Sequence, residues 1–194
     1  MARTDVEICN MALGHIGAQN SITALDNSSF LSKQCNLWYA HARMAVLEAD
    51  NWQFSRKRIE LERHDDDPPD EWYFRYQYPA DAMRVWYIER RQQMLLTPPF
   101  EVDSTPSILT NAEEAVAVYS FDQDDVTKFS SKFVDALSYY LAAKLAFPVT
   151  KKRTTGRDMM EYYASALDDA RGNVEGQRPP QASAAWIRAR KRYA

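Results

Sequence analysis

Residues 29–54 carry the longest helical pattern in the chain, and the pattern stops at two aromatic residues, Trp52 and Phe54. Its apolar side chains recur every three or four positions and so share one helix face: Leu31, Cys35, Trp38, Ala42 and Ala45. Ser28 or Ser29 stands where such a helix needs its N-terminal cap. The sequence therefore predicts a core helix from about residue 29 to residue 50, with which the rest of the chain has to pack.

Three further segments have a helical period. In residues 4–17, Thr4 and Glu7 have the spacing of a capping box and Gly17 is the expected stop; the apolar stripe is Val6, Cys9, Leu13 and Ile16. A third helix is predicted after Asp122, with apolar positions from Phe129 to Leu145 and its end before Pro148. A fourth is expected to begin at Thr154 or Thr155 and to end between Gly172 and Gly176.

Between residues 55 and 121 the apolar period changes to two, which is typical of strands. We predict short strands at 55–63, 72–78, 83–90, 97–104 and 113–121, with Ile59 and Leu61 on one side of the first. The fold class expected is α+β and mainly helical. Residues 1–54 and 122–176 would form a four-helix-type bundle, 55–121 an inserted small antiparallel β subdomain, and 177–194 an extended C-terminal tail, called the C-terminal extension below.

Catalytic and cofactor motifs are missing from the sequence. The chain has five glycines in 194 residues and contains neither GxGxxG nor GxxxxGK[ST], so a glycine-rich phosphate loop is not expected. Neither GxSxG nor HExxH occurs either. We therefore expect a protein that is not an enzyme and that needs no cofactor.

Metal ligands are equally poorly supported. Cys9 and His15, like Cys35 and His41, are six positions apart, which is no zinc spacing and puts the two side chains on opposite helix faces. Both cysteines are expected to be reduced and buried. The densest carboxylates, in residues 64–71, lack the spacing of a calcium loop and contain two prolines, which favours an exposed loop over a Mg²⁺ or Ca²⁺ site.

The charge of the chain is unevenly distributed. The formal net charge is −3, yet residues 177–194 hold five basic residues and no acidic one, which leaves −8 for residues 1–176. The sequence contains no run of 18 apolar residues, so no membrane partner is expected, and its first residues do not resemble a secretion signal, which predicts synthesis in the cytosol.

The basic end also carries aromatic and aliphatic side chains that are unusual in a free terminus. We predict that it docks on a partner through Trp186, Ile187, Arg188, Arg190, Lys191, Arg192 and Tyr193. Contact with a nucleic-acid backbone and simple disorder are the alternatives.

Four segments together resemble the tail tubular protein A, or head-to-tail adaptor, family of short-tailed bacteriophages. They are DVEICNMALGHIGA at 5–18, ITALDNSS at 22–29, NWQF at 51–54 and YQYPADAMRV at 76–85. The helix at 129–147 and the helix after it also fit, so the resemblance covers the chain to about residue 176.

The resemblance implies a structural virion protein at the portal vertex. Members of this family assemble as a ring, typically of twelve copies, beneath the portal protein; the ring extends the DNA channel and meets the tail nozzle protein, with tail fibres nearby in some phages. DNA would pass through without sequence-specific binding. In several adaptors a C-terminal extension reaches the portal, which suggests that role for Trp186–Tyr193. The alternatives are a nucleic-acid-binding protein acting through its basic end and a small metal-dependent hydrolase using the acidic loop.

Overall fold

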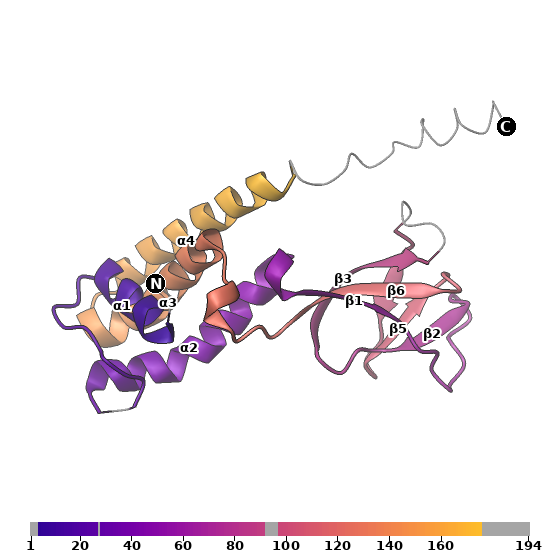
Figure 1. The fold of residues 1–194 in the computed structure, drawn as a ribbon, viewed down its shortest axis with the longest axis horizontal. Coiled ribbons are helices and arrows are strands. Elements are labelled where there is room, and N and C mark those ends of the chain that lie inside the picture. The colour runs from indigo at the N-terminus through magenta and orange to yellow at the C-terminus, as the bar shows by residue number, and fades with distance from the viewer. Residues whose placement is uncertain (1–3, 27, 92–96, 176–194) are drawn as a thin grey trace. The chain divides into compact units, whose positions relative to one another are not determined.

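The computed structural model describes residues 4–26, 28–91 and 97–175, and its chain divides into two compact units. One unit comprises the described residues up to Phe54 together with Asp122–Val174 and contains the helices; the other comprises Ser55–Phe121 and contains the strands (Figure 1). The fold is therefore mixed α+β, as predicted, with four helices and two three-stranded antiparallel sheets among the described residues.

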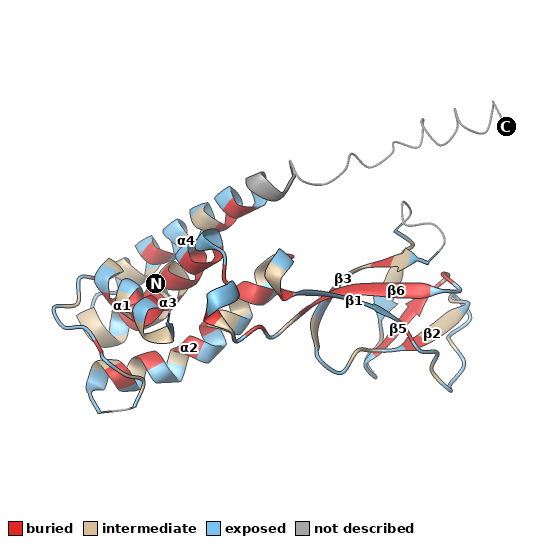
Figure 2. Ribbon diagram, viewed as in Figure 1, coloured by how far each residue is buried: buried red, intermediate tan, exposed pale blue. Residues whose placement is uncertain are grey.

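The helical unit is built on α3 (Ser131–Thr150), which packs against both α1 (Asp5–His15) and α2 (Phe30–Ala49). Nine residues of α3 are buried, among them Phe133, Leu137, Leu141 and Leu145 at four-residue spacing. The fourth helix, α4 (Arg153–Glu175), lies against α3. Gly156 lies at this contact, where an added Cβ would be 3.4 Å from the carbonyl oxygen of Ala143. Figure 2 shows the buried residues of these helices on their mutually facing sides.

Both ends of α1 are capped as predicted. The Thr4 hydroxyl accepts from the Glu7 N–H at 3.2 Å, and the Glu7 carboxylate accepts from the Thr4 N–H at 3.1 Å. At the other end Gly17 has φ +71°, a left-handed conformation that glycine adopts without a steric cost. The N–H groups of Gly17 and Ala18 donate to the carbonyls of Gly14 and Leu13, which satisfies the last turn of the helix.

The buried face of α2 is rotated from the predicted one. The helix is capped by Ser29 and buries Ser32, Cys35, Tyr39, Ala42, Val46 and Leu47, whereas Leu31, Trp38 and Ala45 are half-buried. The prediction was wrong because it followed apolar character alone. Polar groups on this face are satisfied instead: the Ser32 hydroxyl donates to the Ala24 carbonyl at 2.8 Å, and the Tyr39 hydroxyl donates to Asp5 at 3.0 Å.

The predicted limits of the third helix were also wrong. Asp125 caps a short 3-10 turn, η2 (Val126–Lys128), and α3 begins later, after the Ser130 cap. The helix then continues through Pro148 to Thr150. Pro148 has no N–H and so cannot donate a backbone hydrogen bond within the helix. Two other hydrogen bonds hold the last turn. The Thr150 hydroxyl donates to the Ala146 carbonyl, and the Lys151 N–H donates to the Phe147 carbonyl.

Four aromatic rings pack together where the chain leaves the helical unit and returns to it. Trp52 and Phe54 lie at the exit, and Phe129 and Phe133 follow the return; their five ring-to-ring distances are between 4.7 and 6.2 Å. The Trp52 indole N–H donates to the Val46 carbonyl at 2.8 Å, so its one polar group is satisfied although the residue is buried. We call these four residues the aromatic cluster.

The β unit consists of two sheets. The first has the order β1-β6-β3, from β1 (Arg56–Glu60), β6 (Ala115–Phe121) and β3 (Ala82–Arg90). The second has the order β2-β5-β4, from β2 (Phe74–Gln77), β5 (Ser107–Thr110) and β4 (Phe100–Val102). After β1 the chain passes to the second sheet: the Leu61 N–H donates to Ala115 of β6, and the Glu62 carbonyl then accepts from Gln77 of β2.

The two sheets share one hydrophobic core. Its buried members are Leu61, Tyr76, Val85, Ile88, Ile108, Ala112, Ala115, Ala117 and Tyr119. Tyr76 is almost completely buried, and its hydroxyl donates to the Ala112 carbonyl at 2.7 Å. Of the pair predicted for one side of the first strand, Leu61 is buried but Ile59 is 45% exposed, and the other four residues of β1 are exposed as well.

One strand was missed in the sequence. The sequence of β5, Ser107–Thr110, is SILT, in which apolar and polar side chains do not alternate. All four residues are buried in the structure. The strand expected at 97–104 is only three residues long in the structure, β4, and β5 pairs with it and with β2. In the described part of the chain no helix is long and apolar enough to span a membrane.

Truncating the central ring of the aromatic cluster tests its contribution to stability. Phe133→Ala should lower the free energy of unfolding by about 3–5 kcal/mol, because the side chain is fully buried and leaves a cavity. Phe147→Ala, the same change on the same helix, is the control: Phe147 is 51% exposed and should cost less than about 1 kcal/mol. Urea denaturation followed by circular dichroism measures both, and equal losses would contradict the assignment.

Candidate interaction surfaces

The residues predicted to dock on a partner, Trp186, Ile187, Arg188, Arg190, Lys191, Arg192 and Tyr193, lie outside the residues that the structure describes. Candidate sites are therefore sought on the surfaces of the two units. Three features of the helical unit and two of the β unit stand out.

The exposed side of α2 carries a row of large apolar side chains. Phe30, Leu37 and Met44 are 54%, 65% and 38% exposed and are seven residues apart. Seven residues are nearly two helical turns, so the three side chains lie along one line of about 21 Å. This line lies opposite the buried Cys35 and Tyr39. Single exposed apolar residues are common on protein surfaces, but here three lie in register on one side of the helix, with Gln34 and His41 between them. We call Phe30, Leu37 and Met44 the α2 row.

A second surface is a groove of about 340 Å³ between α3 and α4. Tyr139 of α3 stacks on His15 of α1, with ring centroids 4.3 Å apart, and Tyr162 of α4 lies 5.6 Å from Tyr139. The carboxylates of Asp135 and Asp169 also line this groove. Two of these three rings, Tyr139 and Tyr162, line the groove beside the two aspartates, and Lys132 lines it as well.

His15 sits at the inner end of this ring stack. Its Nε2 lies 3.1 Å from the hydroxyl of Ser138, which donates to the carbonyl of Asp135 at 2.9 Å. Burial lowers the pKa of His15, and the nearby Asp135 carboxylate opposes this shift only in part. The His15 residue is half-buried.

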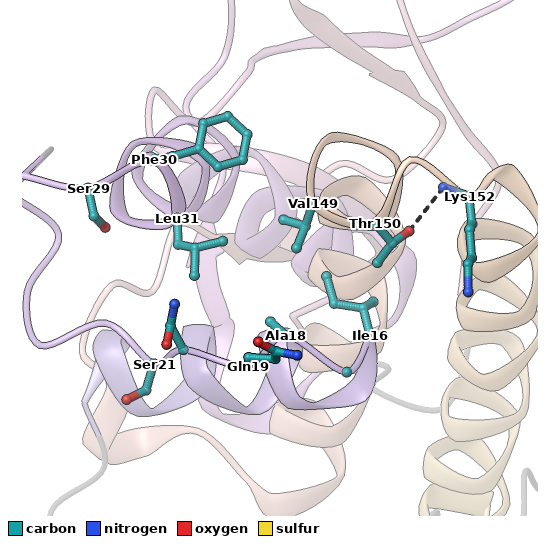
Figure 3. A pocket seen from close by; sticks show the side chains of 12 residues that line it. Ile16, Ala18, Gln19, Ser21, Ser29, Phe30, Leu31, Val149, Thr150 and Lys152 are labelled. Atoms are coloured by element: carbon teal, nitrogen blue, oxygen red, sulfur yellow. Dashed lines mark hydrogen bonds between the residues drawn. The ribbon is translucent and has the colours of Figure 1, made fainter.

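The third feature is an open groove of about 660 Å³ at the end of the helical unit. Figure 3 shows Leu31 and Val149 on one side of it and Gln19 and Ile16 on the other. Phe30, the first residue of the α2 row, is part of its lining. The Lys152 N–H donates to the Thr150 hydroxyl at 3.1 Å, which fixes the connection between α3 and α4 at its edge. The α2 row therefore begins at a hollow in the surface.

In the β unit, the acidic loop predicted at residues 64–71 is exposed at its five carboxylates: Asp65, Asp66, Asp67, Asp70 and Glu71. Its start is fixed by Arg75 of β2. The Arg75 carbonyl accepts from the His64 N–H, and its guanidinium lies 2.5 Å from Asp103 and 3.9 Å from Asp66. Hydrogen bonds from the Ser104 N–H and from Arg75 lower the pKa of Asp103. Arg75 therefore joins this loop to the turn after β4.

The turn between β2 and β3 is held by a second carboxylate. Asp81 accepts from the Lys57 ammonium at 2.5 Å and from the Tyr119 hydroxyl at 2.8 Å. These hydrogen bonds lower the pKa of Asp81, whereas burial and Asp81 together raise the pKa of Tyr119 to about 12. The Tyr-Pro-Ala-Asp turn is thus fastened to both β1 and β6.

Over the described ranges, no three or more His, Cys, Asp or Glu side chains are grouped so that they could hold a metal ion. Cys9 and Cys35 are free thiols and both are buried, as predicted.

Sequence reasoning missed the two helical surfaces for different reasons. The α2 row has a signal, the seven-residue spacing of Phe30, Leu37 and Met44, which the search for a buried face overlooked. The α3–α4 groove has no such signal, because Tyr139 and Tyr162 meet only after two helices pack.

The lowered pKa of His15 predicts a pH-dependent loss of stability. The unfolded chain, with a histidine pKa near 6.5, binds the proton more readily than the folded protein does. His15 therefore destabilises the fold as the pH falls through about 6.5 and does not do so above that value. His15→Gln should reduce the slope of melting temperature against pH between about 5 and 7. Equal slopes in wild type and His15→Gln would contradict this.

Comparison with known proteins adds no relative: no protein-family model matches the sequence, and a search of the curated proteins gives no match.

Proposed function

We propose that the protein is a structural virion protein, a head-to-tail adaptor that assembles as a ring beneath the portal of a short-tailed bacteriophage. On this proposal the four helices are the four-helix-type bundle of that family, and the β unit is its inserted subdomain. The ring, of twelve copies in the family, extends the DNA channel and joins the portal protein to the tail nozzle protein. The C-terminal extension reaches the portal.

The observation that carries the proposal is the α2 row. A ring subunit has to bury side chains that a free monomer leaves in water, and Phe30, Leu37 and Met44 supply such side chains along about four turns of helix. Closed rings use two different faces of each subunit, so the α2 row would meet a different surface of the neighbouring copy.

The positions of the resembling residues also support a structural role. Residues 5–18 supply α1 with Glu7 of its capping box and with its C-terminal turn at Gly17. Residues 51–54 supply Trp52 and Phe54 of the aromatic cluster, and Asp81 of residues 76–85 fastens a turn in the β unit. Each of these residues packs, caps or pairs within its own unit. The resemblance to the adaptor family therefore lies in residues that hold the fold together, as expected for a structural protein.

The charge of the body is compatible with a DNA conduit. Residues 1–176 have a formal charge of −8. A basic lumen would hold the phosphates by releasing their counterions, whereas an acidic one lets the duplex pass. The ring would therefore act on DNA by confining it.

Placing a charge in the α2 row tests the self-association. Leu37→Glu should weaken assembly more than tenfold, because each buried leucine contributes on the order of 1.5–3 kcal/mol. Asn36→Asp adds the same charge at the neighbouring position, outside the row, and is the control. Native mass spectrometry, of the protein alone and with a portal ring, measures the oligomer. Unchanged assembly of the Leu37→Glu protein would exclude the α2 row as a subunit contact.

Removing the C-terminal extension tests the proposed contact with the portal. A chain ending at residue 176 should keep the melting temperature of the full chain, since the described cores lie before that residue, but should bind a portal ring less tightly. Co-sedimentation with the portal ring measures the binding. If the shortened protein binds as tightly as the full chain, the extension is not the portal contact.

A further inference from the structure

Cys9 of α1 and Cys35 of α2 lie in the core of the helical unit. Both are free thiols, and both residues are 0% exposed. Each belongs to the buried face of its helix. The sequence has two cysteines in all, so no third thiol competes with this pair within the chain. The adaptor function proposed above gives neither of them a task.

A hydrogen bond one helical turn away sets how α1 and α2 face each other. The Tyr39 hydroxyl donates to the Asp5 carboxylate at 3.0 Å. Cys9 follows Asp5 by four residues on α1, and Cys35 precedes Tyr39 by four residues on α2. Residues four apart share one side of a helix, so Cys9 and Cys35 are the next facing pair along two antiparallel helices that meet at Asp5 and Tyr39.

The two thiols are hydrogen-bonded to each other. This hydrogen bond raises the pKa of Cys9, and burial and the Asp5 carboxylate act in the same direction. The same hydrogen bond lowers the pKa of Cys35 against the effect of burial. Cys35 therefore loses its proton before Cys9 does. A thiolate in contact with a second thiol is the arrangement from which a disulfide forms, because the thiolate is the attacking species and its partner is already in place.

We propose that Cys9 and Cys35 are a site of oxidation, at which a low-molecular-weight disulfide cross-links α1 to α2. In the first step the Cys35 thiolate attacks one sulfur of the small disulfide and expels the other half as a thiolate. In the second step the Cys9 sulfur attacks the Cys35 sulfur and expels the remaining half. The protons of Cys9 and Cys35 pass to the two thiolates released. Two protein thiols are thus oxidised to one disulfide, and the small disulfide is reduced to two thiols.

The new bond would close a covalent ring from residue 9 to residue 35. This ring contains residues 16–21, which line the open groove of the helical unit, and Phe30, the first residue of the α2 row. The Asn10 side chain already ties this connection to α1, since it donates to the Ile22 carbonyl at 2.9 Å and accepts from the Ile22 N–H at 2.8 Å. A cross-link restricts the unfolded chain, so the oxidised protein should be the more stable form.

Burial determines the rate of the reaction. Because neither cysteine is exposed, the oxidant reaches Cys35 only when α1 and α2 separate locally. Oxidation of the folded protein should therefore be slow, and the finished disulfide should be protected from reducing agents in the same way. The cross-link is independent of the adaptor function, because it uses only residues inside the helical unit.

Incubation of the full-length protein with bis(hydroxyethyl) disulfide, below its melting temperature, tests the proposal. Intact-protein mass spectrometry should show the loss of two hydrogen atoms. Digestion with trypsin without reduction should then give residues 4–33 linked to residues 34–43, because Arg3, Lys33 and Arg43 are cleavage sites. The melting temperature of the oxidised protein should rise by about 5–10 °C and should return to its starting value after reduction with dithiothreitol.

Cys9→Ala and Cys35→Ala are the controls, each of which removes one partner of the pair. Neither variant should gain stability from the oxidant; a rise in melting temperature equal to that of the wild type would place the effect elsewhere and overturn the proposal. An unchanged mass of the wild type after prolonged incubation, or a disulfide that joins two copies of the chain, would overturn it as well. So would an oxidised protein that melts no higher than the reduced one, since the bond would then not fit between the packed helices.

Discussion

The packing of Trp52 and Phe54 against Phe129 and Phe133 determines how a chain interrupted by a second unit can still form one helical core. The helices on either side of the interruption are joined by no short loop, so contacts between side chains have to hold them together. Aromatic rings are suited to this, since each buries a large apolar area with few rotatable bonds. Gln123 adds to the closure: its amide donates to the Phe54 carbonyl at 3.4 Å, across the same junction. The buried face of α3 then extends this contact along α1 and α2.

The sequence allowed the fold class and most elements to be predicted, and the failures have physical causes. Period and capping chemistry identified α1 well, because Thr4, Glu7 and Gly17 act within one or two helical turns. The face of α2 could not be derived in that way, since burial of Ser32 and Tyr39 depends on partners in other segments. The same holds for β5, which is identified as a strand only by its pairing with β2 and β4.

The candidate surfaces also differ in whether they depend on one segment or on the packing of several. The α2 row lies on a single helix, so its seven-residue spacing was present in the sequence before any packing was known. The α3–α4 groove is lined by residues of two helices, and no local sequence pattern predicts it. The C-terminal extension differs from the rest of the chain in its charge, which can be read directly from the composition. A surface on one helix can be found from its spacing in the sequence, whereas a surface made by two helices depends on how they pack.

The pairing of Arg56 with Ser120 in the first sheet has a consequence for how the protein reaches its folded state. Bringing residues 54 and 122 together in an unfolded chain means closing a long loop, and its entropic cost is borne before any helical contact is made. Once β1 has paired with β6, that loop is already closed. During synthesis all six strands leave the ribosome before α3, the helix against which α1 and α2 pack. The β1–β6 pairing therefore brings the two ends of the insertion together through hydrogen bonds of the β unit itself, and the aromatic cluster does not have to close that loop alone.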